Sequence, residues 1–173
     1  MQTINPKVYA AGDVTGRDMF VYMAAYGAKI AAENALNGCC STRTYDATTM
    51  PSVVFTDPQV ASVGLTEAAA RETGLDVDTS VLPLSAVPRY IAARDTRGLI
   101  KLVAESGSGR LLGAHIQAPE GSDAIQTAVL AIKAGMTVDD LGETIFPYLT
   151  GVEGLKLAAQ TFNKDVTKLS CCA

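Results

Sequence analysis

The sequence predicts an α+β fold in which an antiparallel sheet is flanked by helices and preceded by a separate strand–turn–helix unit. A hairpin pattern with a Gly/Ser turn lies at 98–118, and helical periodicity follows it. The strand–turn–helix at the start has no neighbouring strands, which a parallel sheet would require. The 173 residues suffice for one domain and part of another. The expected organisation is a domain remnant (1–40), a linker (41–50), the main domain (51–162) and a mobile tail (163–173).

Composition excludes several classes of protein. The chain carries 14 Lys+Arg against 18 Asp+Glu, a net charge of −4, so no nucleic-acid partner is expected. Hydrophobic residues make up 48%, enough to form a buried core. No apolar run reaches the roughly 18 residues of a membrane span, and no signal-peptide pattern opens the chain. We therefore expect a cytoplasmic protein without a membrane partner.

The first forty residues predict a strand at 7–11, a polar turn, and a helix at 19–36 that ends at Asn37-Gly38. One flank of this helix carries only small side chains, which allow another backbone or a flat ligand to come close. These residues are Ala24, Ala25, Gly27, Ala28, Ala31 and Ala32.

The main domain opens with two strands, 52–56 and 60–65, around the turn Asp57-Pro58. Thr66 is placed to cap a helix that Gly74 ends. Four further strands are expected at 77–84, 90–94, 98–105 and 110–118.

Three helices follow. The first carries apolar residues at i, i+3, i+4 and i+7 between Ile125 and Ile132. The second is short and begins at Thr137. The third begins with a capping-box sequence, Thr150 to Glu153, and continues with apolar residues at helical spacing as far as Phe162.

His115 is the only histidine, so any histidine-dependent mechanism must use it. It lies within the strand 110–118, where a packed or edge residue is a more common role than a catalyst. Zinc sites built on paired histidines are excluded by this count.

Four cysteines form two adjacent pairs, Cys39-Cys40 and Cys171-Cys172. Neighbouring Cα atoms lie about 3.8 Å apart, whereas a relaxed disulfide needs about 4.4–6.8 Å, so a bridge between neighbours would be strained. Two adjacent thiolates can instead hold a soft metal ion. We interpret Cys171 and Cys172 as a metal or redox pair and Cys39 and Cys40 as an incidental loop pair. Lipidation of the terminal pair is the alternative, but the C-a-a-X order is absent.

Three segments bring a family into view. Residues 5–13, Asn-Pro-Lys-Val-Tyr-Ala-Ala-Gly-Asp, resemble the second flavin-binding signature of the pyridine nucleotide–disulfide oxidoreductases. Residues 51–163 resemble their C-terminal dimerisation (interface) domain. The segment 146–165, together with 168–172, is similar to the mercuric reductases of that family.

The resemblance implies a homodimeric enzyme that uses NADPH and FAD to reduce Hg(II), its substrate, to elemental mercury. It implies that Cys171 and Cys172 bind Hg(II) and deliver it to the active site of the partner subunit. Asp13 would accept a hydrogen bond from the ribityl chain of FAD, and the helix N-terminus near Val21 would face the flavin. Without the resemblance, Asp13 would be interpreted as a helix cap or turn residue.

Tyr148 stands where disulfide-reducing relatives have a catalytic histidine. A phenol with a pKa of about 10 is a poor base near neutral pH, but it can donate a hydrogen bond to a thiolate or approach a metal held between sulfurs. The alternative is a half-buried aromatic residue before a helix. Glu153 matches the acidic partner of that histidine, although the capping box also explains it.

Two other functions stay open. The chain could be a non-catalytic dimerisation module that pairs through its sheet and the helix Ile125–Ile132. It could also belong to another flavin disulfide reductase such as a dihydrolipoamide dehydrogenase, for which a histidine at position 148 is expected. The first flavin-binding segment, the active-site cysteine pair and the nicotinamide domain of the family have no counterpart in this sequence. We therefore expect a C-terminal fragment that binds no cofactor tightly and is inactive alone.

Overall fold

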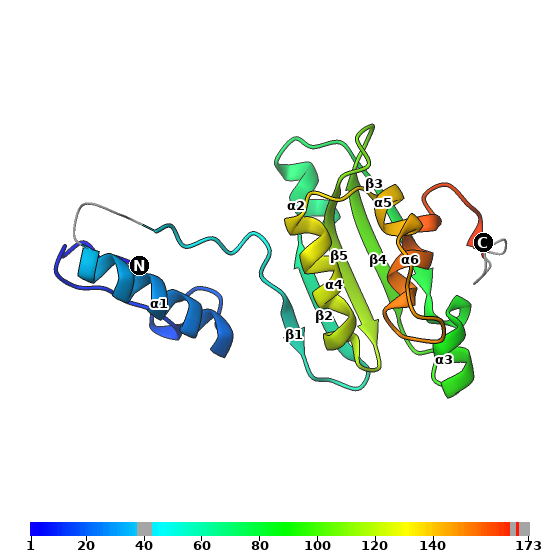
Figure 1. Ribbon diagram of the computed structural model, residues 1–173, viewed down its shortest axis with the longest axis horizontal. Helices are drawn as coiled ribbons and strands as arrows, with labels where there is room; N and C mark the ends of the chain where they lie inside the picture. Colours follow the sequence, from blue (N-terminus) through cyan, green and yellow to red (C-terminus); the bar gives the residue numbers. More distant parts are fainter. Residues whose placement is uncertain (38–42, 167–168, 170–173) are drawn as a thin grey trace. The chain divides into compact units, whose positions relative to one another are not determined.

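The computed structural model describes residues 1–37, 43–166 and 169. The chain divides into two compact units, Met1–Thr48 and Thr49–Ala173. The second unit contains a five-stranded sheet with helices on its faces (Figure 1).

Every neighbouring pair of strands in the sheet is antiparallel, as predicted, and the spatial order is β1-β2-β5-β4-β3. The hairpin of β4 and β5 forms the centre, and its turn closes through the N–H of Gly109, which donates to the carbonyl of Glu105. The strands are β1 (Ser52–Val54), β2 (Gln59–Gly64), β3 (Val77–Pro83), β4 (Leu99–Glu105) and β5 (Leu111–Ala118).

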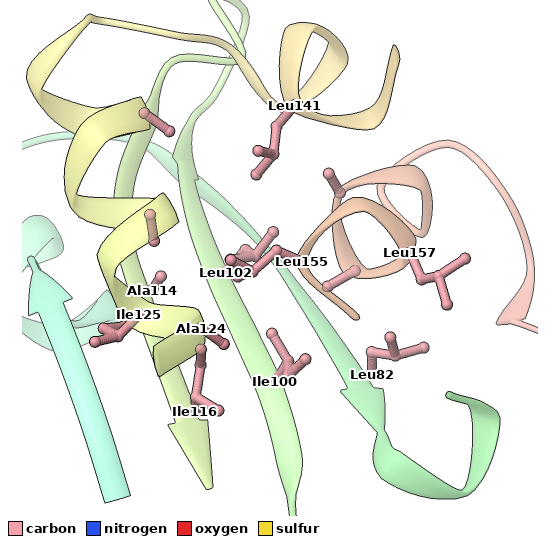
Figure 2. Close-up of a cluster of buried hydrophobic side chains, with 14 of the residues drawn as sticks. Leu82, Ile100, Leu102, Ala114, Ile116, Ala124, Ile125, Leu141, Leu155 and Leu157 are labelled. Carbon is pink, nitrogen blue, oxygen red and sulfur yellow. The ribbon is translucent and has the colours of Figure 1, made fainter. Parts of the chain in front are cut away.

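One face of the sheet forms the main core beneath α4 (Gly121–Lys133) and α6 (Glu153–Gln160) (Figure 2). On β4, Ile100 and Leu102 lie on the same face of the strand and are fully buried against these helices. Leu155 of α6 enters the same cluster. The two helices are held to the sheet by apolar burial, which contributes about 25 cal/mol per Å².

The opposite face carries a smaller apolar cluster under α2 (Glu67–Glu72), in which Ala70 packs with Val77 and Val103. The Thr66 hydroxyl accepts the N–H of Ala69 at 3.1 Å, so the predicted cap is present. A register shift between Val103 and Ala104 accompanies this second cluster.

The short helix α5 (Val138–Glu143) begins with a complete capping box. The Thr137 hydroxyl accepts the N–H of Asp140, and the Asp140 carboxylate accepts the N–H of Thr137. These two bonds satisfy helix N–H groups that would otherwise have no partner.

The predicted strand at 90–94 is wrong. Residues Leu84–Ala86 form a 3-10 turn, η3, and Pro88–Ala93 form a helix, α3. Pro88 occupies the first turn of α3, where its fixed φ and missing N–H favour a helix start. Arg94 ends the helix in the left-handed conformation. Tyr90, the first residue of the predicted strand, is instead the buried residue of α3.

In the first unit, α1 spans Val21–Asn37 and follows the short 3-10 turn η1 (Asp13–Thr15). The predicted strand at 7–11 is wrong, since it is reduced to one isolated bridge between Gln2 and Tyr9. No neighbouring strand is present among the described residues of this unit to extend that bridge into a ladder.

The small flank of α1 receives other parts of the chain. A Cβ on Gly27 would lie 3.1 Å from the sulfur of Met1 and 3.5 Å from Ala11 and Tyr45. Arg43 also contacts this helix, because the Asn34 side chain accepts the N–H of Arg43 and donates to its carbonyl. The small flank was expected to let another backbone or a flat ligand come close. In this unit it is contacted by other residues of the same chain.

Candidate functional site

Tyr148 lies in the loop 144–152, which joins α5 to α6. Its side chain is 61% exposed, so it is more open than the half-buried aromatic residue that was the structural alternative. Among the described residues, no group forms a hydrogen bond with its phenol. Phe146, two residues earlier, is the aromatic side chain that packs on the core. Tyr148 is therefore presented outward from a loop that is anchored beside it.

Hydrogen bonds of the Thr150 and Glu153 side chains hold the part of this loop around Tyr148. The Thr150 hydroxyl donates to the carbonyl of Pro147 at 2.8 Å and accepts the N–H of Glu153 at 3.3 Å. The Glu153 carboxylate accepts the N–H of Leu149 at 3.0 Å. The predicted capping box at Thr150 is therefore only half formed, because Glu153 binds the N–H of Leu149 and not that of Thr150.

Leu149 adopts a left-handed backbone conformation, with φ of 64°. This conformation is costly for a branched side chain, because the Cβ comes too close to the carbonyl oxygen. Sequence reasoning missed Leu149, since no residue pattern indicates a leucine with positive φ. This backbone turn lets the carbonyl of Pro147 and the N–H of Leu149 both form hydrogen bonds, while the side chain of Tyr148 between them stays exposed.

Glu153 is 3% exposed at the start of α6. A carboxylate at this position is favoured by the positive end of the helix dipole. Among the described residues its side chain bonds to the backbone of Leu149 and makes no hydrogen bond to Tyr148. The pairing that the resemblance implied between Glu153 and position 148 is thus absent in this arrangement.

A cleft of about 510 Å³ adjoins the loop, between α3, the start of α4 and residues 150–152. Tyr90 forms part of its wall, and its hydroxyl donates to the carbonyl of Pro119 at 3.4 Å. Burial raises the pKa of Tyr90, and the nearby Glu120 raises it further. Gly151 packs on this phenol, since a Cβ there would lie 2.7 Å from the hydroxyl. The cleft carries charges of both signs, and sequence reasoning did not identify it.

His115 lies apart from this loop, on β5 and on the sheet face opposite α4 and α6. Its Nε2 is 3.2 Å from the carbonyl of Leu65, and Lys101 pairs with it across the β4–β5 ladder. Burial lowers the pKa of His115, outweighing the raising effect of the Leu65 carbonyl, and the Lys101 charge lowers it further. The prediction that His115 is a strand residue is confirmed.

In the first unit, Asp13 and Val21 are both exposed. Asp13 opens η1 after Gly12, and Val21 is the first residue of α1, with 85% of its surface exposed. The first turn of α1 contains no acidic residue. An open carboxylate and an uncovered helix start are compatible with the hydroxyls and the electron-rich ring edge of FAD.

The cysteine pairs Cys39-Cys40 and Cys171-Cys172 lie outside the described residues. Before the second pair, Val166 and Leu169 pack against the main core. Within the described part of the chain, no group of three or more His, Cys, Asp or Glu side chains could hold a metal ion. No helix there is both long enough and apolar enough to cross a membrane.

Comparison with known proteins agrees with this architecture. Residues 50–159 match the family model described as pyridine nucleotide-disulphide oxidoreductase, dimerisation domain. Among solved structures, the HOCl-induced flavoprotein disulfide reductase RclA from Escherichia coli is similar over 90% of this chain and 35% of its own, with a TM-score of 0.80 and 31% identity. LpdA from Mycobacterium tuberculosis is similar over 94% of this chain and 35% of its own, with a TM-score of 0.82 and 26% identity.

Sequence relatives are more similar still. A protein of Acidithiobacillus ferrooxidans named mercuric reductase is 55% identical over all 173 residues, and one of Shigella flexneri with the same name is 56% identical. This chain spans 31% and 30% of those relatives, so it corresponds to about a third of their length. The family match covers well over half of the chain and coincides with the sheet and its helices. The chain therefore belongs to the pyridine nucleotide-disulphide oxidoreductase dimerisation domain family.

Proposed function

We propose that this chain is the C-terminal part of an NADPH- and FAD-dependent oxidoreductase that reduces Hg(II) to Hg(0). In this proposal the sheet domain contributes to a homodimer, and Cys171 and Cys172 bind Hg(II) and pass it to the active site of the partner. The observation that carries the proposal is the identity of about 55% across the whole chain to relatives named mercuric reductase. Conditions that keep thiols reduced favour a cytoplasmic setting.

The chemistry of the cysteine pair fits a thiophilic cation. Deprotonated Cys171 and Cys172 would ligate Hg(II) with two soft sulfur atoms, releasing their protons on binding. An incoming thiolate can replace one sulfur at a time, so the ion moves between sites without entering water. The overall reaction balances as NADPH plus Hg(II) giving NADP⁺, one proton and Hg(0).

Residues of both units have roles in this proposal. Asp13 would hold a ribityl hydroxyl of FAD, and the α1 N-terminus at Val21 would lie toward the flavin edge. FAD, when bound, would relay the two electrons of NADPH. Tyr148 would donate a hydrogen bond to a thiolate or to the ligand sphere of Hg(II). The exposure of Tyr148 supports this role, because its phenol can reach a group outside its own domain.

Mass spectrometry with one equivalent of Hg(II), in excess monothiol competitor, tests the role of the terminal dithiol. We expect one Hg(II) per chain, and loss of binding in Cys171→Ala/Cys172→Ala. The matched control, Cys39→Ala/Cys40→Ala, should bind as the unmodified chain does. If the control loses Hg(II) and the terminal variant retains it, the other cysteine pair is the binding site.

A second candidate function is a dimerisation module that has no chemistry of its own. The description of the matching family supports it. On the helix Ile125–Ile132, Ile125, Ala128 and Val129 are buried against the chain's own sheet, so pairing through this helix would use its other face, where Leu130 is 60% exposed. Sedimentation at micromolar concentration tests pairing, and a dimer that binds no Hg(II) would favour this function.

The third possibility, a dihydrolipoamide dehydrogenase or similar enzyme, has less support. Tyr148 stands where such an enzyme is expected to have histidine, and the relatives above 50% identity carry the name mercuric reductase.

A further inference from the structure

The loop 144–152 combines exposure with anchoring. Its large apolar side chains Ile145, Tyr148 and Leu149 are exposed, with Ile145 at 94%. Exposed apolar groups would let a loop vary in conformation unless its backbone is held. Here the holding contacts converge on the residues immediately before and after Tyr148.

The contact on Leu149 comes from Glu153. Its carboxylate is buried and accepts the N–H of Leu149 at 3.0 Å. Because this oxygen is buried, its loss would leave the N–H of Leu149 without a protein acceptor. The bond closes a short ring of backbone around Leu149, whose φ of 64° would otherwise revert to a more common conformation.

We propose that Glu153 is a positioning residue, which fixes Leu149 in the left-handed conformation and thereby sets the direction of Tyr148. Glu153 acts through the backbone and takes no part in proton transfer with the phenol. Any catalytic effect of the Tyr148 direction rests on the proposed function. The direction itself is independent of that function and can be measured without mercury.

This role requires a particular kind of side chain at position 153. The position needs an acceptor oxygen of the right length, and the negative charge is secondary. Glu153→Gln keeps such an oxygen and should preserve the loop. Glu153→Ala removes it and should release Leu149. Glycine adopts positive φ without the cost that a Cβ brings, so Leu149→Gly should restore the loop direction in the Glu153→Ala background.

Amide hydrogen exchange and ring signals, measured by NMR on the complete 173-residue chain, test the proposal. The N–H of Leu149 should exchange slowly in the unmodified chain and in Glu153→Gln, and at least about tenfold faster in Glu153→Ala. The Tyr148 ring signals should shift in Glu153→Ala and return toward their original positions when Leu149→Gly is added. Gln160→Ala is the matched control, because it removes another side-chain contact of α6, the bond to the Gly142 carbonyl, and keeps the Glu153 acceptor.

The proposal is overturned if Leu149 exchanges equally fast in the unmodified chain and Glu153→Ala, or if Glu153→Gln behaves like Glu153→Ala. It is also overturned if Gln160→Ala accelerates the exchange of the Leu149 N–H selectively, since the effect would then reflect a general loosening of α6. Should Glu153→Ala fail to fold, Glu153→Gln decides alone, with a protected Leu149 and unshifted Tyr148 ring as the expected result. The two proposals can fail separately. If the unmodified chain shows the expected Leu149 protection but binds no Hg(II), the proposed function is contradicted and the role of Glu153 is not.

Discussion

Gly154 of α6 packs directly on Ile100 of β4. A Cβ added to Gly154 would lie 2.5 Å from Cδ1 of Ile100 and 3.7 Å from the methyl groups of Val87. Real Cβ atoms do not approach other atoms so closely, so Ile100 or the helix would have to shift if residue 154 carried a Cβ.

Gly154→Ala should therefore destabilise the domain, although alanine is the better helix former. Ile100 is fully buried and has little room to move, so overpacking should lower the free energy of unfolding by about 1–3 kcal/mol. Gly142→Ala in α5 is the control, since its Cβ would make only an ordinary contact of 3.4 Å with Gln160. That variant should gain up to about 1 kcal/mol from helix propensity. Urea unfolding compares the two, and equal effects would show that packing on Ile100 is unimportant.

The stability of the chain should fall as the pH decreases below about 6.5. Burial lowers the pKa of His115, so the unfolded chain binds a proton on this ring at a higher pH than the folded chain does. The contribution of neutral His115 to stability is complete above the pKa that this ring has in the unfolded chain. It declines as the pH falls toward the lower pKa of the ring in the folded chain. Unfolding in urea at pH 7.5, 6.5 and 5.5 measures this slope. His115→Gln should flatten it, and an unchanged slope in that variant would assign the effect to other groups.

The sheet and most of its helices could be predicted because burial imposes regular spacing on the sequence. The spacing of Ile100 and Leu102 and the helical spacing from Ile125 onward both reflect the face that packs on the main core. The helix α3 was missed because Tyr90 favours strands locally, while its burial in a helix depends on tertiary contacts. Pro88 was the available signal for that helix start.

The candidate site was less predictable. Tyr148 and Glu153 could be named from the resemblance, but their relationship could not. The capping-box spacing predicts a bond from Glu153 to the N–H of Thr150, whereas the positive φ of Leu149 places a different N–H at the carboxylate. Such a conformation depends on the packing of the whole loop, and no local residue pattern encodes it.

Replacing the phenol at 148 should slow mercury reduction more than it weakens the fold. Tyr148 is exposed and has no hydrogen-bond partner among the described residues, so Tyr148→Phe should leave the free energy of unfolding nearly unchanged. If the phenol donates to a thiolate during turnover, its loss should lower kcat/KM for Hg(II) by about 10- to 100-fold. Steady-state kinetics of a complete reductase that carries this segment gives the value. Unchanged kcat/KM in Tyr148→Phe would remove the phenol from the mechanism.

The most direct test of the proposed function is to complete the enzyme. The mercuric reductase of Shigella flexneri can be built with this chain in place of its matching third, guided by the 56% identity between them. We predict a dimeric, FAD-containing chimera that releases Hg(0) from Hg(II) with NADPH, and that loses this activity under thiol competition in Cys171→Ala/Cys172→Ala. A chimera that dimerises and retains FAD but fails to reduce Hg(II), while the parent enzyme does so, would contradict the account.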